Sequence, residues 1–168
     1  VIDPQIASQI TSILSDNPAR CSLGAFSCNN PLTLGSRPVA AKTGTTEDYK
    51  DAWTVGYTPS IVTTVWAGNN NNKPMTQAAS IVSAPIWNKF MKTTLEGSPV
   101  EQFTQAPGLK KVTLDSNTGK TPTEITKQTR TDIFPAWYSL TKADASQKGT
   151  IDKVSGKLAT ECTPVDAR

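Results

Sequence analysis

Apolar residues recur at helical spacing in two stretches of the chain. The first stretch follows Asp3-Pro4, in which aspartate suits the N-cap and proline the first position of a helix. This predicted helix ends at Asn17-Pro18, and its apolar face consists of Ile6, Ile10, Ile13 and Leu14. The second helix is predicted from about residue 77 to residue 95, and Pro85 either lies in its first turn or kinks it.

Between the two helices, the pattern changes to the alternation that is typical of strands. We expect a loop over residues 19–37 and then three short strands, over residues 39–43, 52–57 and 61–68. The short links between these strands predict an antiparallel meander. Alternation places one apolar set of the middle strand on a single face: Trp53, Val55 and Tyr57. The tryptophans expected to anchor a core between the sheet and the second helix are Trp53, Trp66 and Trp87.

The composition changes after about residue 97, because the rest of the chain is rich in Thr, Ser, Lys and Gly. Residues 109–114 are compatible with a strand, and residues 115–119 with a turn. No internal repeat is evident, and the apolar cluster expected to dock elsewhere consists of Ile133, Phe134, Trp137 and Tyr138. The sequence therefore predicts an α+β fold, with an antiparallel sheet packed with helices over residues 1–97 and a small accessory region or tail over residues 98–168.

Composition and charge narrow the chemistry. The chain has 168 residues, a net charge of +3 and no histidine. Without histidine, Ser-His-Asp, Cys-His and His-ligated metal mechanisms are excluded, and we expect no metal and no cofactor. The lysines are scattered and not interleaved with stacking aromatic residues, which argues against nucleic-acid binding.

The three cysteines lack the spacing of a zinc site. Cys21 and Cys28 flank a short loop, so they either form a disulfide in an oxidising compartment or remain free thiols. Cys162 is then left unpaired. There is no apolar run long enough to span a membrane, and the abrupt opening at Val1-Ile2 suggests an excised fragment whose targeting signal would lie upstream.

The most informative stretch is Lys42-Thr43-Gly44-Thr45-Thr46, at the end of a predicted strand. Lys-Thr-Gly alone is a weak signal, but its surroundings strengthen it: Asp51-Ala52-Trp53, Gly56-Tyr57-Thr58-Pro59, Val65-Trp66-Ala67-Gly68 and Ala84-Pro85-Ile86-Trp87. With these segments, residues 1–91 resemble the end of the transpeptidase domain of class A penicillin-binding proteins. That family carries Ser-x-x-Lys, Ser-Asp-Asn-type and Lys-Thr-Gly motifs.

The resemblance implies an acyl-serine D,D-transpeptidase that cross-links peptidoglycan stem peptides and is acylated by β-lactams. An exposed strand accepts an incoming peptide as a further strand, and Gly44 lets that peptide approach closely. Lys42 supplies a fixed positive charge near the substrate carboxylate. By resemblance, the Thr43 and Thr45 hydroxyls bind that carboxylate, the Thr45 N–H forms half of an oxyanion hole, and Thr46 completes the substrate-binding stretch.

The chain departs from the family pattern because no Ser-x-x-Lys motif precedes Lys42. The only such string, Ser139-Leu140-Thr141-Lys142, lies downstream and is interpreted as chance. Ser15-Asp16-Asn17 imitates the second motif, but it is better explained as a helix end and loop. Gly119-Lys120-Thr121 resembles a phosphate-binding loop, yet the required first glycine is replaced by Leu114, so a hairpin turn is expected. The nucleophile is thus expected outside this chain, which alone should be inactive.

Two alternatives remain: a serine β-lactamase-like hydrolase, and a non-catalytic wall-associated module on the same scaffold. The expected partners are a peptidoglycan stem peptide, β-lactam antibiotics and a missing N-terminal part of the same protein. Self-association is also expected, because the strand over residues 61–68 lacks one neighbour. The resemblance places the parent protein at the extracytoplasmic face of a bacterial membrane, anchored by a segment outside this chain.

Overall fold

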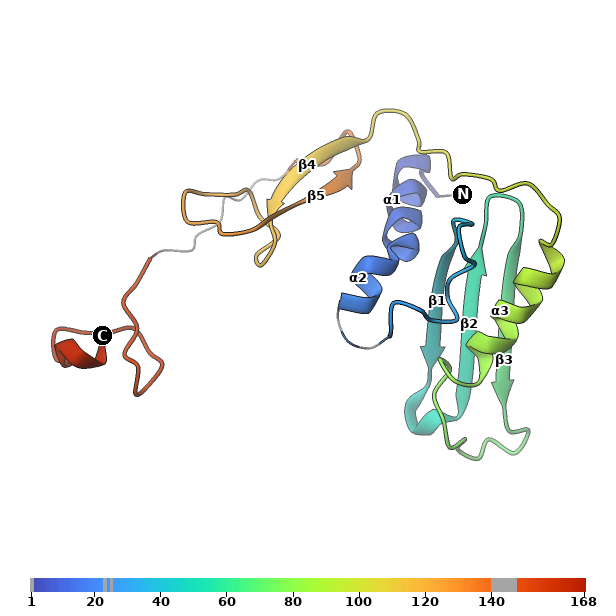
Figure 1. Cartoon of the computed structure of the whole chain (residues 1–168), viewed down its shortest axis with the longest axis horizontal. Coiled ribbons are helices and arrows are strands. Elements are labelled where there is room, and N and C mark those ends of the chain that lie inside the picture. The colour runs from blue at the N-terminus through green and yellow to red at the C-terminus, as the bar shows by residue number, and fades with distance from the viewer. Residues whose placement is uncertain (1, 23, 25, 140–147) are drawn as a thin grey trace. The chain divides into compact units, whose positions relative to one another are not determined.

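The computed structural model describes residues 2–22, 24, 26–139 and 148–168, and it divides into two compact units (Figure 1). The first unit comprises residues 1–108 and the second residues 109–168. Residues 98–108 therefore belong to the first unit and not to the C-terminal region that the sequence predicts from residue 98. The Arg37 guanidinium fixes the start of this segment, because it donates hydrogen bonds to the carbonyl groups of Leu95, Ser98 and Pro99.

Two helices open the chain where the sequence predicts one helix and a loop. Helix α1 spans Pro4–Ser15, and the Asp3 carboxylate caps it by accepting hydrogen bonds from the first turn. The predicted stop at Asn17-Pro18 ends α1, but the same residues begin a short helix α2, Asn17–Ser22. The Asp16 carboxylate accepts a hydrogen bond from the Ala19 N–H at 2.8 Å. Proline is well suited to a first helical turn, and this property outweighs its role as a helix breaker here.

The central sheet is the predicted antiparallel meander. It contains β1 (Ala40–Thr45), β2 (Asp51–Tyr57) and β3 (Val62–Gly68), in the order β1-β2-β3. A short turn, Glu47–Tyr49, connects β1 to β2. In the observed register, Gly44 pairs with Trp53, and Trp53 pairs with Trp66. Paired residues project on the same face of a sheet, so these three residues form one cross-strand row.

Helix α3, Ser83–Thr94, packs along β2 and β3 and covers one face of the sheet (Figure 1). Trp87 of α3 is fully buried, and its indole N–H donates to the Thr63 carbonyl at 3.1 Å. Pro85 lies in the first turn of α3, which settles the two alternatives left by the sequence. The buried core cluster consists of Leu32, Leu34, Val39, Ala41, Ala84, Trp87, Met91 and Leu95.

The opposite face of the sheet is partly uncovered in the described residues. Trp53 and Trp66 are 42% and 46% exposed, and their rings pack against each other with centroids 6.3 Å apart. The expectation that they anchor the core with Trp87 is therefore wrong for both. Alternation reveals that two faces differ, but not which face α3 covers. The helix packs on the small residues of β2, Ala52, Thr54 and Gly56.

The connection between α2 and β1 is held by a disulfide and a buried amide. Cys21 and Cys28 form the disulfide, with their Cα atoms 4.9 Å apart. Asn30 is buried, and its side chain donates to the Asn17 side chain and to the Ser27 carbonyl while accepting from the Leu32 N–H. These contacts hold the described residues on either side of the disulfide in a region whose composition suggests only a loop.

The second unit begins with a two-stranded antiparallel sheet of β4 (Lys110–Asp115) and β5 (Thr129–Phe134). The strand and turn expected at 109–119 are present, but β5 is not among the predicted strands. Its sequence, Thr-Arg-Thr-Asp-Ile-Phe, is mostly polar and so lacks a hydrophobic signal. Phe134 stacks on Tyr138 with ring centroids 4.9 Å apart, and Trp137 packs against Tyr138. A final 3₁₀ turn spans Val165–Ala167.

The structure also corrects the impression that the chain has no repeat. Residues 114–126 and 151–163 share one pattern. It begins with an aliphatic residue, Asp, two variable residues, Thr or Ser, Gly and Lys. After two more variable residues it ends with Thr-Glu-x-Thr. Asp152 lies 37 residues after Asp115, and every identical position follows at the same distance. The variable positions between them conceal this similarity in the sequence alone.

The two copies also share their hydrogen bonds. In the first, the Asp115 carboxylate accepts from the N–H groups two and three residues later, at 2.8 and 3.0 Å. In the second, the Asp152 carboxylate does the same at 2.8 and 3.2 Å. Gly119 and Gly156 both have φ near +70°, and each N–H donates to the carbonyl of its own aspartate. We name this element the Asp-Gly turn, with one copy at residues 114–126 and one at residues 151–163.

Candidate active site

The Lys-Thr-Gly sequence forms β1, which pairs only with β2 in the described part of the chain. Lys42 and Gly44 project from the uncovered face of the sheet, in register with Val55 and Trp53. The Lys42 ammonium donates to the Thr43 carbonyl at 2.7 Å and is otherwise exposed to solvent. The motif thus presents a positive charge and a side-chain-free position on the same face.

The backbone of β1 presents hydrogen-bonding groups along its unpaired edge. The Thr46 N–H donates to the Asp51 carbonyl at 3.2 Å, so this amide points towards β2. Successive residues of a strand point their amides in alternate directions, and the amides of Thr43 and Thr45 therefore point away from β2. A peptide that approached this edge would meet these N–H groups.

The threonine side chains of the motif lie on the face covered by α3. Thr43 is half-buried beside Thr54 in register, and the Thr45 hydroxyl accepts a hydrogen bond from the Ala79 N–H at 3.2 Å. The Thr45 hydroxyl thereby fixes the segment that leads into α3. Since it acts as the acceptor in that bond, its own hydrogen is free to be donated to another group.

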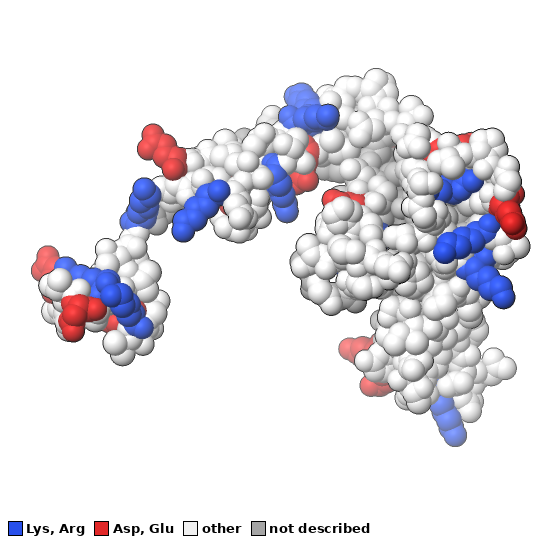
Figure 2. Space-filling view, viewed as in Figure 1, with Lys and Arg blue, Asp and Glu red and all other residues white. Residues whose placement is uncertain are grey.

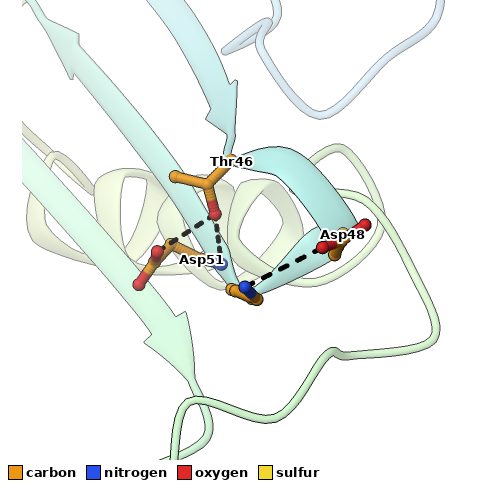
Figure 3. A network of polar contacts seen from close by, with 4 residues as sticks. Thr46, Asp48 and Asp51 are labelled. Carbon is orange, nitrogen blue, oxygen red and sulfur yellow. Dashed lines mark hydrogen bonds and ion pairs between the residues drawn. The ribbon is translucent and has the colours of Figure 1, made fainter.

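Thr46 is engaged within the turn between β1 and β2 (Figure 3). Its hydroxyl lies 3.0 Å from the Asp51 carboxylate and accepts from the Asp51 N–H at 2.8 Å. The other oxygen of the Asp51 carboxylate accepts from the Trp66 indole N–H at 2.9 Å. In the same turn, Lys50 and Asp48 form an exposed ion pair at 3.8 Å. Thr46 is thus a structural residue of the turn.

Arg20 is a residue at this site that the sequence did not indicate. Its guanidinium donates to the Leu14 carbonyl at the end of α1, to the Asn17 side chain and, at 3.1 Å, to the Ala41 carbonyl of β1. Burial lowers the pKa of Arg20, and the nearby Asp16 carboxylate opposes this effect. Arg20 therefore holds the beginning of β1 against the helices, on the edge opposite β2. A lone arginine in a polar loop gives no sequence signal for such a role.

The strings that imitate family motifs belong, where they are described, to local structural elements. Ser15 ends α1, Asp16 caps α2, and the Asn17 side chain bonds Arg20 and Asn30, so this segment has a structural role. Gly119-Lys120-Thr121 lies in the first Asp-Gly turn. Of the downstream Ser-x-x-Lys string, Ser139 is described, whereas residues 140–142 lie outside the described residues.

Charges of both signs are spread over the molecular face seen in Figure 2. Within the described ranges, no group of three His, Cys, Asp or Glu side chains could hold a metal ion. Cys162 is exposed and is not part of a disulfide. In that same part of the chain, no helix combines the length and the apolar character needed to cross a membrane.

No family model matches this chain. Comparisons with individual proteins do find relatives. Penicillin-binding protein 1A of Escherichia coli is 36% identical over 103 residues, covering 52% of this chain. That of Pseudomonas aeruginosa is 32% identical over 122 residues, covering 71% of this chain. This chain spans only 12% and 14% of the length of these two relatives. The crystal structure of penicillin-binding protein 1A from Haemophilus influenzae matches with a TM-score of 0.66 and 28% identity, over 85% of this chain and 22% of that one.

Proposed function

We propose that this chain, which is a C-terminal region of a class A penicillin-binding protein, supplies the substrate-binding edge strand of a serine D,D-transpeptidase. The observation that carries the proposal is the unpaired edge of β1, which presents the Thr43 and Thr45 amides beside the Lys42 ammonium. A peptide can add to such an edge as a further strand. Gly44 leaves room for its close approach.

Within this proposal, each residue of the motif has a distinct role. Lys42 attracts the terminal carboxylate of the stem peptide, and the Thr45 N–H stabilises the oxyanion that forms on the attacked carbonyl. The Thr45 hydroxyl, an acceptor towards Ala79, donates its own hydrogen to the carboxylate. Thr43 contributes its edge amide, and Thr46 acts by holding the turn.

The proposed reaction requires a serine from a part of the protein outside this chain. Its hydroxyl oxygen attacks the carbonyl of the penultimate D-alanine, an ester bond forms, and the C–N bond to the terminal D-alanine breaks. The proton lost by the hydroxyl ends on the departing amine. A second stem-peptide amine then displaces the serine. A β-lactam follows the first step only, and its ring nitrogen takes the place of the departing amine.

The names of the relatives support a penicillin-binding transpeptidase over a β-lactamase-like hydrolase and over a non-catalytic module. They also support peptidoglycan and β-lactams as partners. We infer that the full-length protein acts at the extracytoplasmic face of the membrane and is anchored by a segment outside this chain. The disulfide between Cys21 and Cys28 fits an oxidising compartment of that kind.

The test compares Lys42→Ala with Lys120→Ala in the full-length protein. Loss of a well-placed electrostatic group at the transition state typically costs about 2.7–4 kcal/mol, or about 10²–10³ in rate. We expect Lys42→Ala to lower the second-order rate of acylation by a fluorescent penicillin to this extent. Lys120 lies in the first Asp-Gly turn, so Lys120→Ala should leave the rate unchanged.

Equal acylation rates for the two variants would refute the assignment of β1 as the substrate strand. Mass spectrometry of the isolated 168-residue chain after incubation with excess penicillin provides a second check. We expect no added mass, because orientation without an activated nucleophile forms no acyl bond. An adduct on Ser139 would instead identify the downstream Ser-x-x-Lys string as functional.

A further inference from the structure

The Asp51 carboxylate lies at the point where all three strands of the central sheet end together. One oxygen accepts from the Trp66 indole of β3. The other lies 3.0 Å from the hydroxyl of Thr46, which directly follows β1 (Figure 3). The backbone adds two further bonds, because the Asp51 N–H donates to the Thr46 hydroxyl and the Thr46 N–H donates to the Asp51 carbonyl. Asp51 itself is the first residue of β2.

These contacts engage the Thr46 hydroxyl both as a donor and as an acceptor. It donates its only hydrogen to the Asp51 carboxylate and accepts from the Asp51 N–H, so Thr46 and Asp51 form a closed pair. The pair has a fixed geometry only while the carboxylate is in place, because the carboxylate is the acceptor for the hydroxyl hydrogen. The indole N–H of Trp66 in turn holds the carboxylate in its orientation.

The turn enclosed by this pair has an unfavourable backbone conformation. Asp48 and Tyr49 both have positive φ, at 58° and 54°. Residues other than glycine rarely adopt this region, and for a bulky aromatic residue such as Tyr49 it is especially unfavourable. Such a turn persists only where its surroundings fix it. The Tyr49 carbonyl accepts from the Met75 N–H, and the Thr46–Asp51 pair closes the base of the turn.

We propose that Asp51 is a positioning residue of the transpeptidase site, which holds the peptide between Thr45 and Thr46 so that the Thr45 N–H meets the developing oxyanion. The inference rests on the proposed function, because the Thr45 N–H has this task only in acyl transfer. Asp51 lies on β2, and we assign it no contact with the substrate. Its effect reaches the reaction through the adjoining residue, Thr46.

The physical reason is the narrow tolerance of an oxyanion hole. A donor must stay within about 0.5 Å of its productive position, and a displacement of about 1 Å can cost about 100-fold in rate. The peptide unit between Thr45 and Thr46 directly follows the Gly44–Thr45 unit, which carries the Thr45 N–H. Rotation of the Thr45–Thr46 unit on loss of the Thr46–Asp51 pair would therefore redirect the Thr45 N–H. The rest of β1 is fixed by its pairing with β2 and by Arg20.

The experiment uses the full-length protein and separates two constants for a fluorescent penicillin: the dissociation constant of the non-covalent complex and the rate constant of acyl-bond formation. Asp51→Ala and Thr46→Val each remove the pair, and we expect each to lower the acylation rate constant about 10- to 100-fold. The double variant should lose no more than either single variant, because both remove the same contact. The melting temperature and the dissociation constant should change little.

Two matched variants separate geometry from charge. Asp51→Asn retains an acceptor for the Trp66 indole and, through its amide, a donor to the Thr46 hydroxyl oxygen, so acylation should stay close to that of the wild type. Asp48→Asn removes a negative charge from the same turn without touching Thr46, and asparagine tolerates the positive φ. It should leave both constants unchanged.

Several outcomes would overturn the proposal. A folded Asp51→Ala variant that is acylated like the wild type would do so, as would an Asp51→Asn variant as slow as Asp51→Ala, because charge would then be the cause. A loss that lies entirely in the dissociation constant would also do so. If Asp51→Ala does not fold, Thr46→Val decides alone. A wild-type protein that is not acylated would refute the proposed function and this inference with it, whereas an active wild type limits any failure to Asp51.

Discussion

Two glycines of the central sheet show how much the surroundings of a single residue matter. A Cβ atom added at Gly56 would lie 2.3 Å from the buried Trp87 ring and 3.0 Å from the Ala41 side chain. A Cβ atom added at Gly44 would meet only the Trp53 Cβ, at an ordinary contact distance of 3.5 Å. The first glycine therefore makes room for the core, and the second leaves room on the uncovered face.

We accordingly expect Gly56→Ala and Gly44→Ala to affect different properties, the first stability and the second acylation. Gly56→Ala should destabilise the protein by about 1–3 kcal/mol, because the packed Trp87 ring cannot yield without cost. Gly44→Ala should leave the melting temperature nearly unchanged but lower the penicillin acylation rate by about 10- to 100-fold, since the methyl group displaces the substrate. Thermal unfolding and acylation of the full-length protein measure both effects. A Gly44→Ala variant with wild-type acylation would show that substrate does not approach this face.

At this scale the sequence singles out the Lys-Thr-Gly motif and its following threonines, but it assigns no role to Arg20 or Asp51. The motif is a local string, and alternation then places Lys42 and Gly44 on one face. Arg20 contacts a carbonyl group of β1 that is distant in the sequence. Asp51 follows a polar turn whose sequence does not indicate its contacts with Thr46 and Trp66. Nothing in a single polar residue reveals which distant partner it will meet, so these positions required the structure.

At the scale of elements, we predict that the stability of the two Asp-Gly turns depends on pH in the same way. Backbone hydrogen bonds from Thr118 and from Val154 are the main causes that lower the pKa of Asp115 and of Asp152, respectively. The ordinary value for aspartic acid is about 3.9. Because the folded-state pKa is the lower one, the stabilising contribution is complete above about pH 3.9 and is lost as the pH falls further, through the folded-state pKa.

Carboxyl NMR titration of the chain should therefore show both aspartates titrating below the ordinary value. Amide exchange at Thr118 and Val154 should become faster over the same acidic range. Asp115→Asn keeps an accepting oxygen but no titrating group, so the first turn should lose its pH dependence while the second retains it. Titration of both carboxyls at the ordinary value would contradict the hydrogen bonds described for these turns.

The elements that could be predicted are those with a periodic apolar signal. The strands β1 to β3 and the helices α1 and α3 were predicted from such signals, with ends shifted by a few residues. Helix α2 starts with Asn17-Pro18, a dipeptide that is equally typical of the end of a helix. The strand β5 is polar and is stabilised by its pairing with β4, a contact between segments separated by the turn. Local composition does not contain that information.

At the scale of the whole molecule, the uncovered face of the first unit predicts self-association of the isolated chain. Val62 and Trp66 of β3 are 68% and 46% exposed, and β3 pairs only with β2 in the described ranges. An apolar strand with a free edge pairs readily with another copy. Light scattering at increasing concentration should show a rising mass. Val62→Lys should reduce this rise, because a charged edge residue opposes pairing. A compact monomer with a high melting temperature at all concentrations would contradict the prediction.

The boundary between the two compact units does not lie where the composition changes. Composition changes near residue 97, whereas the first compact unit extends to residue 108. Contacts of Ser8 with the Ala106 amide and of Gln5 with the Pro107 carbonyl attach this polar segment to α1. Polar segments can be held by such bonds without any hydrophobic signal, so a change in composition marks a domain boundary only approximately.

The repeated Asp-Gly turn has the pattern expected of a duplicated segment. Two segments that agree in six identical positions at a constant spacing of 37 residues, and in their hydrogen bonds, are what duplication of one stretch of a gene leaves behind. Four of the six identical residues make contacts within the turn: the accepting aspartate, the glycine with positive φ and the two threonines. Apart from the identical lysine and glutamate, the other positions differ between the two copies. A tail built of such repeated turns can therefore be lengthened or shortened by whole turns without altering the central sheet of the first unit.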